Sequence, residues 1–197
     1  MPDGVRAKRM AYVPQDRTVH WPVTVRDLVG LGRLPFRRPF MAPGIDHNNA
    51  VERALALMDI EPLAGRSALT LSGGELARAL IARAFAQTPE VLLADEPAAG
   101  LDPAHQLRVL DLIHDAVREG MSAVIVLHDL TLAARFCDTL VLLNKGRVCK
   151  TGTPAQVLKP KTLLDVYGYH AHLSKVEGSL AVTPVGLPEK GSTADAR

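Results

Sequence analysis

The chain has 197 residues, of which 47% are hydrophobic and 22% are charged, an ordinary composition for one sizeable globular domain. Its formal net charge of +2 is too balanced to indicate a polyanionic partner, so we expect no binding to nucleic acid. No apolar run approaches the ~20 residues that span a bilayer, and the start of the chain lacks the apolar core of a signal peptide. Any work at a membrane would therefore require another subunit.

The first predicted strand covers residues 10–13, a short apolar run that Pro14 ends. Gln15 follows at the strand exit, where an isolated glutamine is by default a surface residue. Residues 24–31 predict a short helix with Thr24 as its N-cap. The role of Gln15 therefore depends on the motifs that come later in the chain.

Residues 33–40 form a basic and aromatic stretch that prolines interrupt, RLPFRRPF. One interpretation is a solvated surface loop. The other is a docking surface for a membrane-embedded partner, because exposed Phe36 and Phe40 among arginines are unusual in a loop without a partner. The residues of this stretch leave both interpretations open.

Asp46 is expected to cap the next helix, whose apolar residues fall on one face and predict core packing. These residues are Val51, Ala54, Leu55 and Met58. A connector then leads to residues 71–75, LSGGE, which open a helix predicted over residues 73–87.

The beginning of that helix has two features of its own. Ser72 and Glu75 have the spacing of a capping box, in which each side chain accepts a hydrogen bond from the other's backbone amide. Gly73 and Gly74 leave the first amides of the helix bare, so a phosphate could lie against them.

The next predicted strand, residues 91–94, is too short and apolar for a helix and is typical of a parallel strand that is buried on both faces. Asp95 and Glu96 follow at its carboxyl end, where open α/β sheets place their ligands. One carboxylate on Mg²⁺ and one beside a water is a common arrangement for nucleotide hydrolysis.

Asp102 and Pro103 predict the start of another helix, and residues 123–127 a second buried parallel strand, which together indicate a βαβ unit. His128 follows this strand at the edge where we expect Asp95 and Glu96. Most solitary histidines are structural or solvated, so its place at the strand end is the reason to consider it.

The remainder of the chain predicts smaller elements. They are a hairpin over residues 139–151, one or two short helices over 154–167, two short strands over 173–185 and a disordered tail over 188–197. His170 and His172 have no third ligand nearby in the sequence, and Cys137 and Cys149 are expected to be reduced thiols.

The order and spacing of these motifs resemble those of the ABC-type ATPases. LSGGE resembles the signature, VLLADE the Walker B strand and AGLD the D-loop, while AYVPQ and VLHDL resemble the Q-loop and H-loop. The resemblance implies an α/β fold, an incomplete P-loop NTPase core of ABC type with a parallel sheet and flanking helices, plus an α-helical subdomain. It also implies ATP and Mg²⁺ as cofactors and, as family activity, ATP hydrolysis coupled to transport.

Roles follow from this resemblance position by position. Asp95 would hold Mg²⁺, Glu96 would be the general base for the attacking water, and His128 would contact the γ-phosphate. Gln15 would link metal, water and membrane subunit. Asp102 would communicate across a dimer, and the γ-phosphate of the opposite subunit's ATP would lie against Ser72, Gly73, Gly74 and Glu75.

The resemblance also implies partners and a location. Partners would be transmembrane permease subunits, a second ATP-binding subunit and, indirectly, a substrate-binding protein, at the cytoplasmic face of the inner membrane. Residues 24–35, TVRDLVGLGRLP, resemble importers of iron-siderophore, haem or cobalamin. A non-transport ABC ATPase, and a non-hydrolysing remnant that supplies LSGGE in trans, remain as alternatives.

One family motif is missing from the sequence. No segment matches G-x-x-x-x-G-K-[ST], the Walker A loop that cradles the phosphates; residues 186–193 have Ser192 where lysine is required, and Lys150 lacks both glycines. We therefore expect an N-terminally truncated copy with negligible ATP hydrolysis alone and with apolar sheet edge and face exposed. The expected segments are a core remnant (1–15), a helical subdomain (16–88), the core with its hairpin (89–151), C-terminal helices and strands (152–187) and a tail (188–197).

Overall fold

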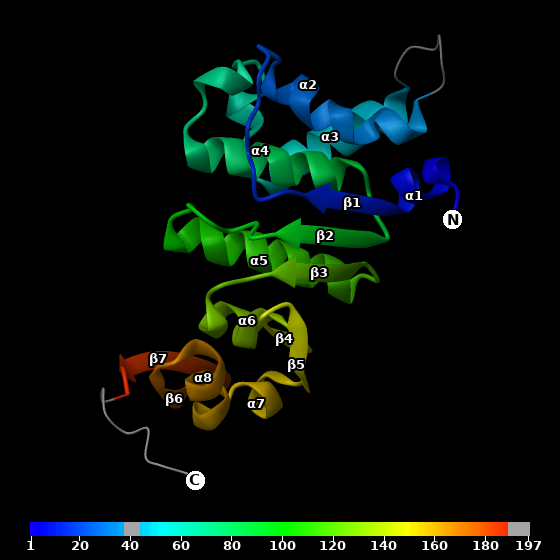
Figure 1. Cartoon of the computed structure of the whole chain (residues 1–197). Helices are drawn as coiled ribbons and strands as arrows, with labels where there is room; N and C mark the ends of the chain where they lie inside the picture. Colours follow the sequence, from blue (N-terminus) through cyan, green and yellow to red (C-terminus); the bar gives the residue numbers. More distant parts are fainter. Residues whose placement is uncertain (38–43, 189–197) are drawn as a thin grey trace. The chain divides into compact units, whose positions relative to one another are not determined.

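The computed structural model describes residues 1–37 and 44–188 and divides into two compact units, residues 1–126 and 127–197 (Figure 1). The finer division into five segments stays a prediction. Phe40 and the tail beyond residue 188 lie outside the described residues. Within the described ranges, no helix is both long and apolar enough to cross a membrane.

The first unit combines a parallel sheet with helices. In chain order it contains α1 (Asp3–Arg9), β1 (Met10–Val13), α2 (Val25–Gly30), the 3₁₀ helix η1 (Leu31–Phe36), α3 (Ile45–Leu57), the 3₁₀ helices η2 (Glu61–Leu63) and η3 (Ala68–Thr70), α4 (Gly73–Ala86), β2 (Val91–Asp95), α5 (Pro103–Arg118) and β3 (Ser122–Val126).

The sheet has the order β1-β2-β3, and both pairs of neighbouring strands are parallel (Figure 1). Val13 lies opposite Ala94, and Asp95 lies opposite Val126. The carboxyl ends of the three strands therefore meet at one edge of the sheet. α5 connects β2 to β3, so the predicted parallel βαβ unit is confirmed.

One face of this sheet is covered and the other is open. Ala11, Leu92 and Ala94 are buried in a core that includes residues of α4 and α5. On the opposite face Tyr12, Val124 and Val126 are 56%, 62% and 50% exposed. The prediction that the strands are buried on both faces is therefore wrong, because described helices cover only one side. The expectation of an exposed apolar sheet face is confirmed.

The helical part of the unit packs α2, α3 and α4 together (Figure 1). Thr24 caps α2 as predicted, since its Oγ1 accepts a hydrogen bond from the Asp27 amide at 3.1 Å. The cap predicted for α3 is wrong. Gly44 occupies the N-cap position and Asp46 lies in the first turn, where its charge still complements the helix dipole. The predicted buried face of α3 is confirmed by Val51, Ala54, Leu55 and Met58.

Part of the stretch expected to be a loop is helical. The 3₁₀ helix η1 continues directly from α2 and contains Pro35. Gly32 lies so close to α4 that an added Cβ would collide with the Arg83 carbonyl oxygen. The Arg33 guanidinium lies 4.1 Å from the centre of the Phe36 ring, and this stacking holds Phe36 at the surface, 38% exposed.

The second unit is built around a small core of Leu142, Val157, Leu158 and Leu163. The predicted hairpin is confirmed, with positive φ at Lys145 and Gly146 in its two-residue turn. The predicted short helices and the later strand pair are also confirmed. The elements are α6 (Leu130–Phe136), β4 (Leu140–Asn144), β5 (Arg147–Gly152), α7 (Pro154–Val157), α8 (Pro160–Tyr167), β6 (His170–Val176) and β7 (Ser179–Gly186).

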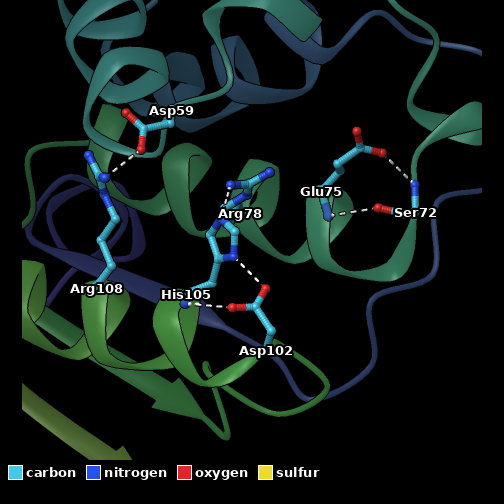
Figure 2. A network of polar contacts seen from close by, with 7 residues as sticks. All are labelled: Asp59, Ser72, Glu75, Arg78, Asp102, His105 and Arg108. Atoms are coloured by element: carbon cyan, nitrogen blue, oxygen red, sulfur yellow. Dashed lines mark hydrogen bonds and ion pairs between the residues drawn. The ribbon is translucent and has the colours of Figure 1, made fainter.

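The capping box that begins α4 is present as predicted (Figure 2). The Ser72 amide donates to Glu75 Oε2 at 2.7 Å, and the Glu75 amide donates to Ser72 Oγ at 3.3 Å. Hydrogen bonding of the carboxylate to the backbone and side chain of Ser72, with a smaller effect of Arg66 and Arg78, lowers the pKa of Glu75 below its ordinary value of 4.5. The ionised carboxylate is therefore the form that stabilises the start of the helix.

Replacing Glu75 should show this dependence on ionisation. Glu75→Ala should lower the free energy of unfolding by about 1 kcal/mol at pH 7, because it removes one half of the cap. Glu75→Gln keeps an acceptor oxygen but cannot ionise. The stability advantage of the wild type over Glu75→Gln should be complete above the unfolded-state pKa and should vanish as the pH falls through the lowered folded-state pKa.

Urea unfolding at several pH values measures this advantage directly. A difference between wild type and Glu75→Gln that stays constant from pH 7 to about pH 3 would contradict the assignment.

Candidate functional site

The ends of β1 and β2 bring together two residues that are distant in the sequence. Gln15 follows β1 by two residues, and Glu96 follows the last residue of β2. Gln15 Nε2 donates a hydrogen bond to Glu96 Oε1 at 3.1 Å. Because a carboxylate can only accept, the amide nitrogen faces Glu96, and the Gln15 carbonyl oxygen is not used in this bond.

Glu96 has an uncommon backbone conformation, with φ of 48° in the left-handed region. For a residue other than glycine this conformation carries strain and is typical of functional sites. The Glu96 amide donates to the Val126 carbonyl oxygen at 3.1 Å, which extends the pairing with β3 by one residue past Asp95.

Arg17 holds the turn that follows Glu96. Its Nη1 donates to the Ala99 carbonyl oxygen at 2.5 Å, and its Nη2 donates to those of Glu96 and Pro97 at 2.9 and 3.2 Å. Burial lowers the pKa of Arg17, and the Glu96 charge partly opposes this effect. No sequence pattern marks Arg17 as functional, because its partners are backbone carbonyls about eighty residues away.

The first turn of α4 presents two glycines that the fold itself does not require. Gly73 has no positive φ, and a Cβ built there would meet no atom within 4 Å. A Cβ at Gly74 would make ordinary contact with Leu101 at 3.6 Å. The Glu75 carboxylate, in contrast, is already engaged by the Ser72 amide.

Asp102 caps α5 as predicted and also joins a network that the sequence did not indicate (Figure 2). Its Oδ1 accepts from the His105 amide at 3.1 Å, and its Oδ2 lies 2.5 Å from His105 Nδ1. His105 Nε2 lies 2.5 Å from Nη1 of Arg78, a residue of α4. One turn further along α5, Arg108 pairs with Asp59 at 2.6 Å.

His128 belongs to the second unit, two residues after the end of β3. Asp129 directly follows it and caps α6, since its Oδ1 accepts from the amides of Thr131 and Leu132 at 2.8 and 2.9 Å. The expectation that His128 lies at the same sheet edge as Asp95 and Glu96 stays a prediction.

The donor set at the strand ends fits a magnesium nucleotide. Asp95 supplies a carboxylate and Gln15 an amide oxygen, and Mg²⁺ in nucleotide sites is held by one or two carboxylates together with phosphate oxygens. Among residues 1–37 and 44–188, no group of three or more His, Cys, Asp or Glu residues could hold a metal ion. The metal would therefore take further ligands from nucleotide and water.

Comparisons with known proteins show which family this chain resembles. Residues 4–99 match the family model described as ABC transporter. The chain is 42% identical over 190 residues to the cobalamin import ATP-binding protein BtuD of Halobacterium salinarum, covering 95% of this chain and 47% of that protein. It is 44% identical over 173 residues to the hemin import ATP-binding protein HmuV of Pseudomonas aeruginosa, covering 85% and 66%.

Solved structures give the same result. A metal-chelate type ABC transporter in an inward-facing conformation superposes with a TM-score of 0.80 at 28% identity, covering 92% of this chain and 73% of that chain. The ATP-binding cassette MJ0796, a dimer bound to ADP and Pi, has a TM-score of 0.68 at 26% identity, covering 78% and 68%. The chain thus spans about half of the length of BtuD and about two thirds of that of HmuV.

The α/β fold, the strand-end carboxylates, the glycines of the capped helix and these matches lead to one conclusion: the chain belongs to the ABC transporter family.

Proposed function

We propose that this chain is part of the ATP-binding subunit of an importer for a metal chelate, namely haem, cobalamin or an iron-siderophore. The observation that carries the proposal is the hydrogen bond between Gln15 and Glu96, which unites the predicted Q-loop and Walker B residues at one sheet edge. The names of the relatives, cobalamin and hemin import proteins, support the substrate class.

The residues at this edge have distinct tasks in the proposal. When bound, Mg²⁺-ATP would supply a phosphoryl group that is open to attack by water. The Asp95 carboxylate and the Gln15 carbonyl oxygen would hold the metal ion. Glu96 would accept the proton of the water, as a general base does, while the Gln15 amide holds one of its carboxylate oxygens in place. His128 would contact the γ-phosphate.

Arg17 would position the general base rather than touch the nucleotide. Its guanidinium binds three carbonyl groups of the turn after β2, including that of Glu96 itself. These hydrogen bonds offset the cost of the left-handed backbone at Glu96. The direction of the Glu96 carboxylate therefore depends on Arg17.

The first turn of α4 would act on a second subunit. The amides beyond Ser72 would face the γ-phosphate of ATP held by the partner subunit, and the open space around Gly73 supports such an approach. Asp102 would take part in the contact between the two subunits. Permease subunits at the cytoplasmic face of the membrane and a substrate-binding protein would complete the importer.

Residues 1–197 contain no G-x-x-x-x-G-K-[ST] loop, so the ATP phosphates lack their usual cradle within this sequence. The proposal therefore includes a partner or segment that supplies this loop. A tagged chain that purifies with a polytopic membrane protein would support transport, whereas purification with ribosomes or DNA would favour a non-transport ABC ATPase.

The purified 197-residue chain should release phosphate from Mg²⁺-ATP no faster than a buffer blank, because it lacks the loop lysine that neutralises the β- and γ-phosphates. Glu96→Gln should leave this background unchanged. Phosphate release that is measurable for the wild type and abolished by Glu96→Gln would overturn the prediction.

Gly73→Ala should affect the stability of the chain and its association with a second subunit differently. The new methyl group meets open space and φ is not positive, so the variant should be as stable as wild type or more stable by roughly 0.4–1 kcal/mol. Its ATP-dependent association with an intact ABC cassette that carries a phosphate loop should weaken about tenfold or more, equivalent to ~1.4 kcal/mol, because the methyl group occupies the phosphate position.

Gly4→Ala in α1 is the matched control, because a Cβ there also meets no atom within 4 Å. Sedimentation with and without Mg²⁺-ATP measures the association, and an equal effect of both variants would refute the role of Gly73.

Arg17→Ala should lower the free energy of unfolding by roughly 1–3 kcal/mol, because three carbonyl groups lose a charged donor. Arg17→Lys should recover only part of this loss, since a single ammonium cannot reproduce the planar fork. Arg53→Ala, an exposed arginine of α3, is the control and should change stability by no more than ~0.5 kcal/mol. Denaturant unfolding in which Arg17→Ala equals Arg53→Ala would contradict the positioning role.

A further inference from the structure

The imidazole of His105 bridges the two segments that the proposed function assigns to the contact between subunits. On one side its Nδ1 lies 2.5 Å from Asp102 Oδ2, at the turn before α5. On the other side its Nε2 lies 2.5 Å from Arg78 Nη1, on α4, the helix that Ser72 caps. Figure 2 shows the three side chains in one continuous line of contacts.

The chemistry of the two neighbours determines where the imidazole proton lies. A guanidinium has only donors, so Nε2 must accept the hydrogen bond from Arg78. An ionised carboxylate has only acceptors, so Nδ1 must carry the proton that bonds to Asp102. Hydrogen bonding to His105 in turn lowers the pKa of Asp102, so this carboxyl group is ionised in the folded chain at neutral pH. His105 is therefore neutral in this arrangement, with its proton on Nδ1.

We propose that Arg78 and His105 are positioning residues that lock the Asp102 turn to the signature helix, and that the lock requires the neutral Nδ1–H tautomer of His105. This inference rests on the proposed function, because the lock matters only if Asp102 and the LSGGE turn both contact a second subunit. The lock would keep these two segments at a fixed position relative to each other within one subunit. Arg78 and His105 act through Asp102 and α4, the two groups that their contacts join.

Protonation of His105 would break one of its two contacts, the one with Arg78. A proton on Nε2 places two donors against each other, so the contact with Arg78 breaks while the contact with Asp102 remains. The charged groups around the ring come from three places. They are Arg78 on α4, Asp102 at the turn before α5 together with Arg108, Asp111 and Asp115 of α5, and Asp59, which pairs with Arg108.

A second contact between the same parts of the chain supplies a matched control. Arg108 of α5 pairs with Asp59 at 2.6 Å, just beyond the end of α3. Like Arg78 it is an arginine that links α5 to the helical part of the unit, but its partner is a carboxylate and not the imidazole. Replacing Arg108 should therefore remove the ion pair with Asp59 without altering the surroundings of the His105 ring.

The experiment is nitrogen-15 NMR of the His105 ring in the full chain near neutral pH, without nucleotide. The wild type and Arg108→Met should show the Nδ1–H tautomer. The double variant Arg78→Met/Asp102→Asn should shift the ring toward Nε2–H, the tautomer that free histidine favours. An Nε2–H tautomer in the wild type, which needs no variant to fold, would overturn the lock.

A second measurement separates this inference from the proposed function. With an intact ABC cassette and Mg²⁺-ATP, Arg78→Met should weaken association several-fold, whereas Arg108→Met should not. A changed imidazole signal in Arg78→Met with unchanged association would show that the lock exists but does not serve assembly, which overturns the inference. Wild-type chain that shows the expected tautomer but never associates with the cassette would instead contradict the proposed function.

Discussion

The parallel pairing of β1 with β2 is the constraint on which the rest of the site depends. Its register places Val13 opposite Ala94, so the residues that follow the two strands leave the sheet at the same edge. Gln15 and Glu96 meet there although they are 81 residues apart in the chain. A parallel pair needs a long crossover, and here the crossover is the whole helical part with its LSGGE helix. One strand pairing therefore fixes both the acidic edge and the start of α4.

Strain at this edge is compensated by contacts from outside the turn. Glu96 adopts a left-handed backbone, which costs free energy for any residue with a side chain. Arg17 binds the carbonyl group of this residue and those of Pro97 and Ala99 further along the turn. The arginine comes from the segment directly after Gln15, so the same segment supplies the partner of the Glu96 carboxylate and the support of its backbone.

The features that could be predicted from the sequence are those with short-range causes. The Ser72–Glu75 cap, the hairpin over residues 139–151 and the parallel βαβ unit depend on residues within a few positions or on strong apolar runs. The roles of Arg17 and His105 could not be predicted, because their partners lie far away in the chain or include backbone carbonyls that any residue could supply. The predicted burial of β3 is wrong, since burial depends on what covers a strand and not on its own residues.

The composition of α4 explains how its first turn can be both rigid and accessible. Five of its seven buried residues are alanines, Ala77, Ala79, Ala82, Ala84 and Ala86, which allow β1, η1, α2 and α3 to approach the helix closely. A helix packed on so many sides has little freedom to tilt. The turn at Ser72 and Gly73 lies at the surface, and the capping box engages the amides of Ser72 and Glu75 but not those of Gly73 and Gly74. The chain is thus rigid in the body of α4, and the first turn of this helix stays exposed, as the proposed contact with another subunit requires.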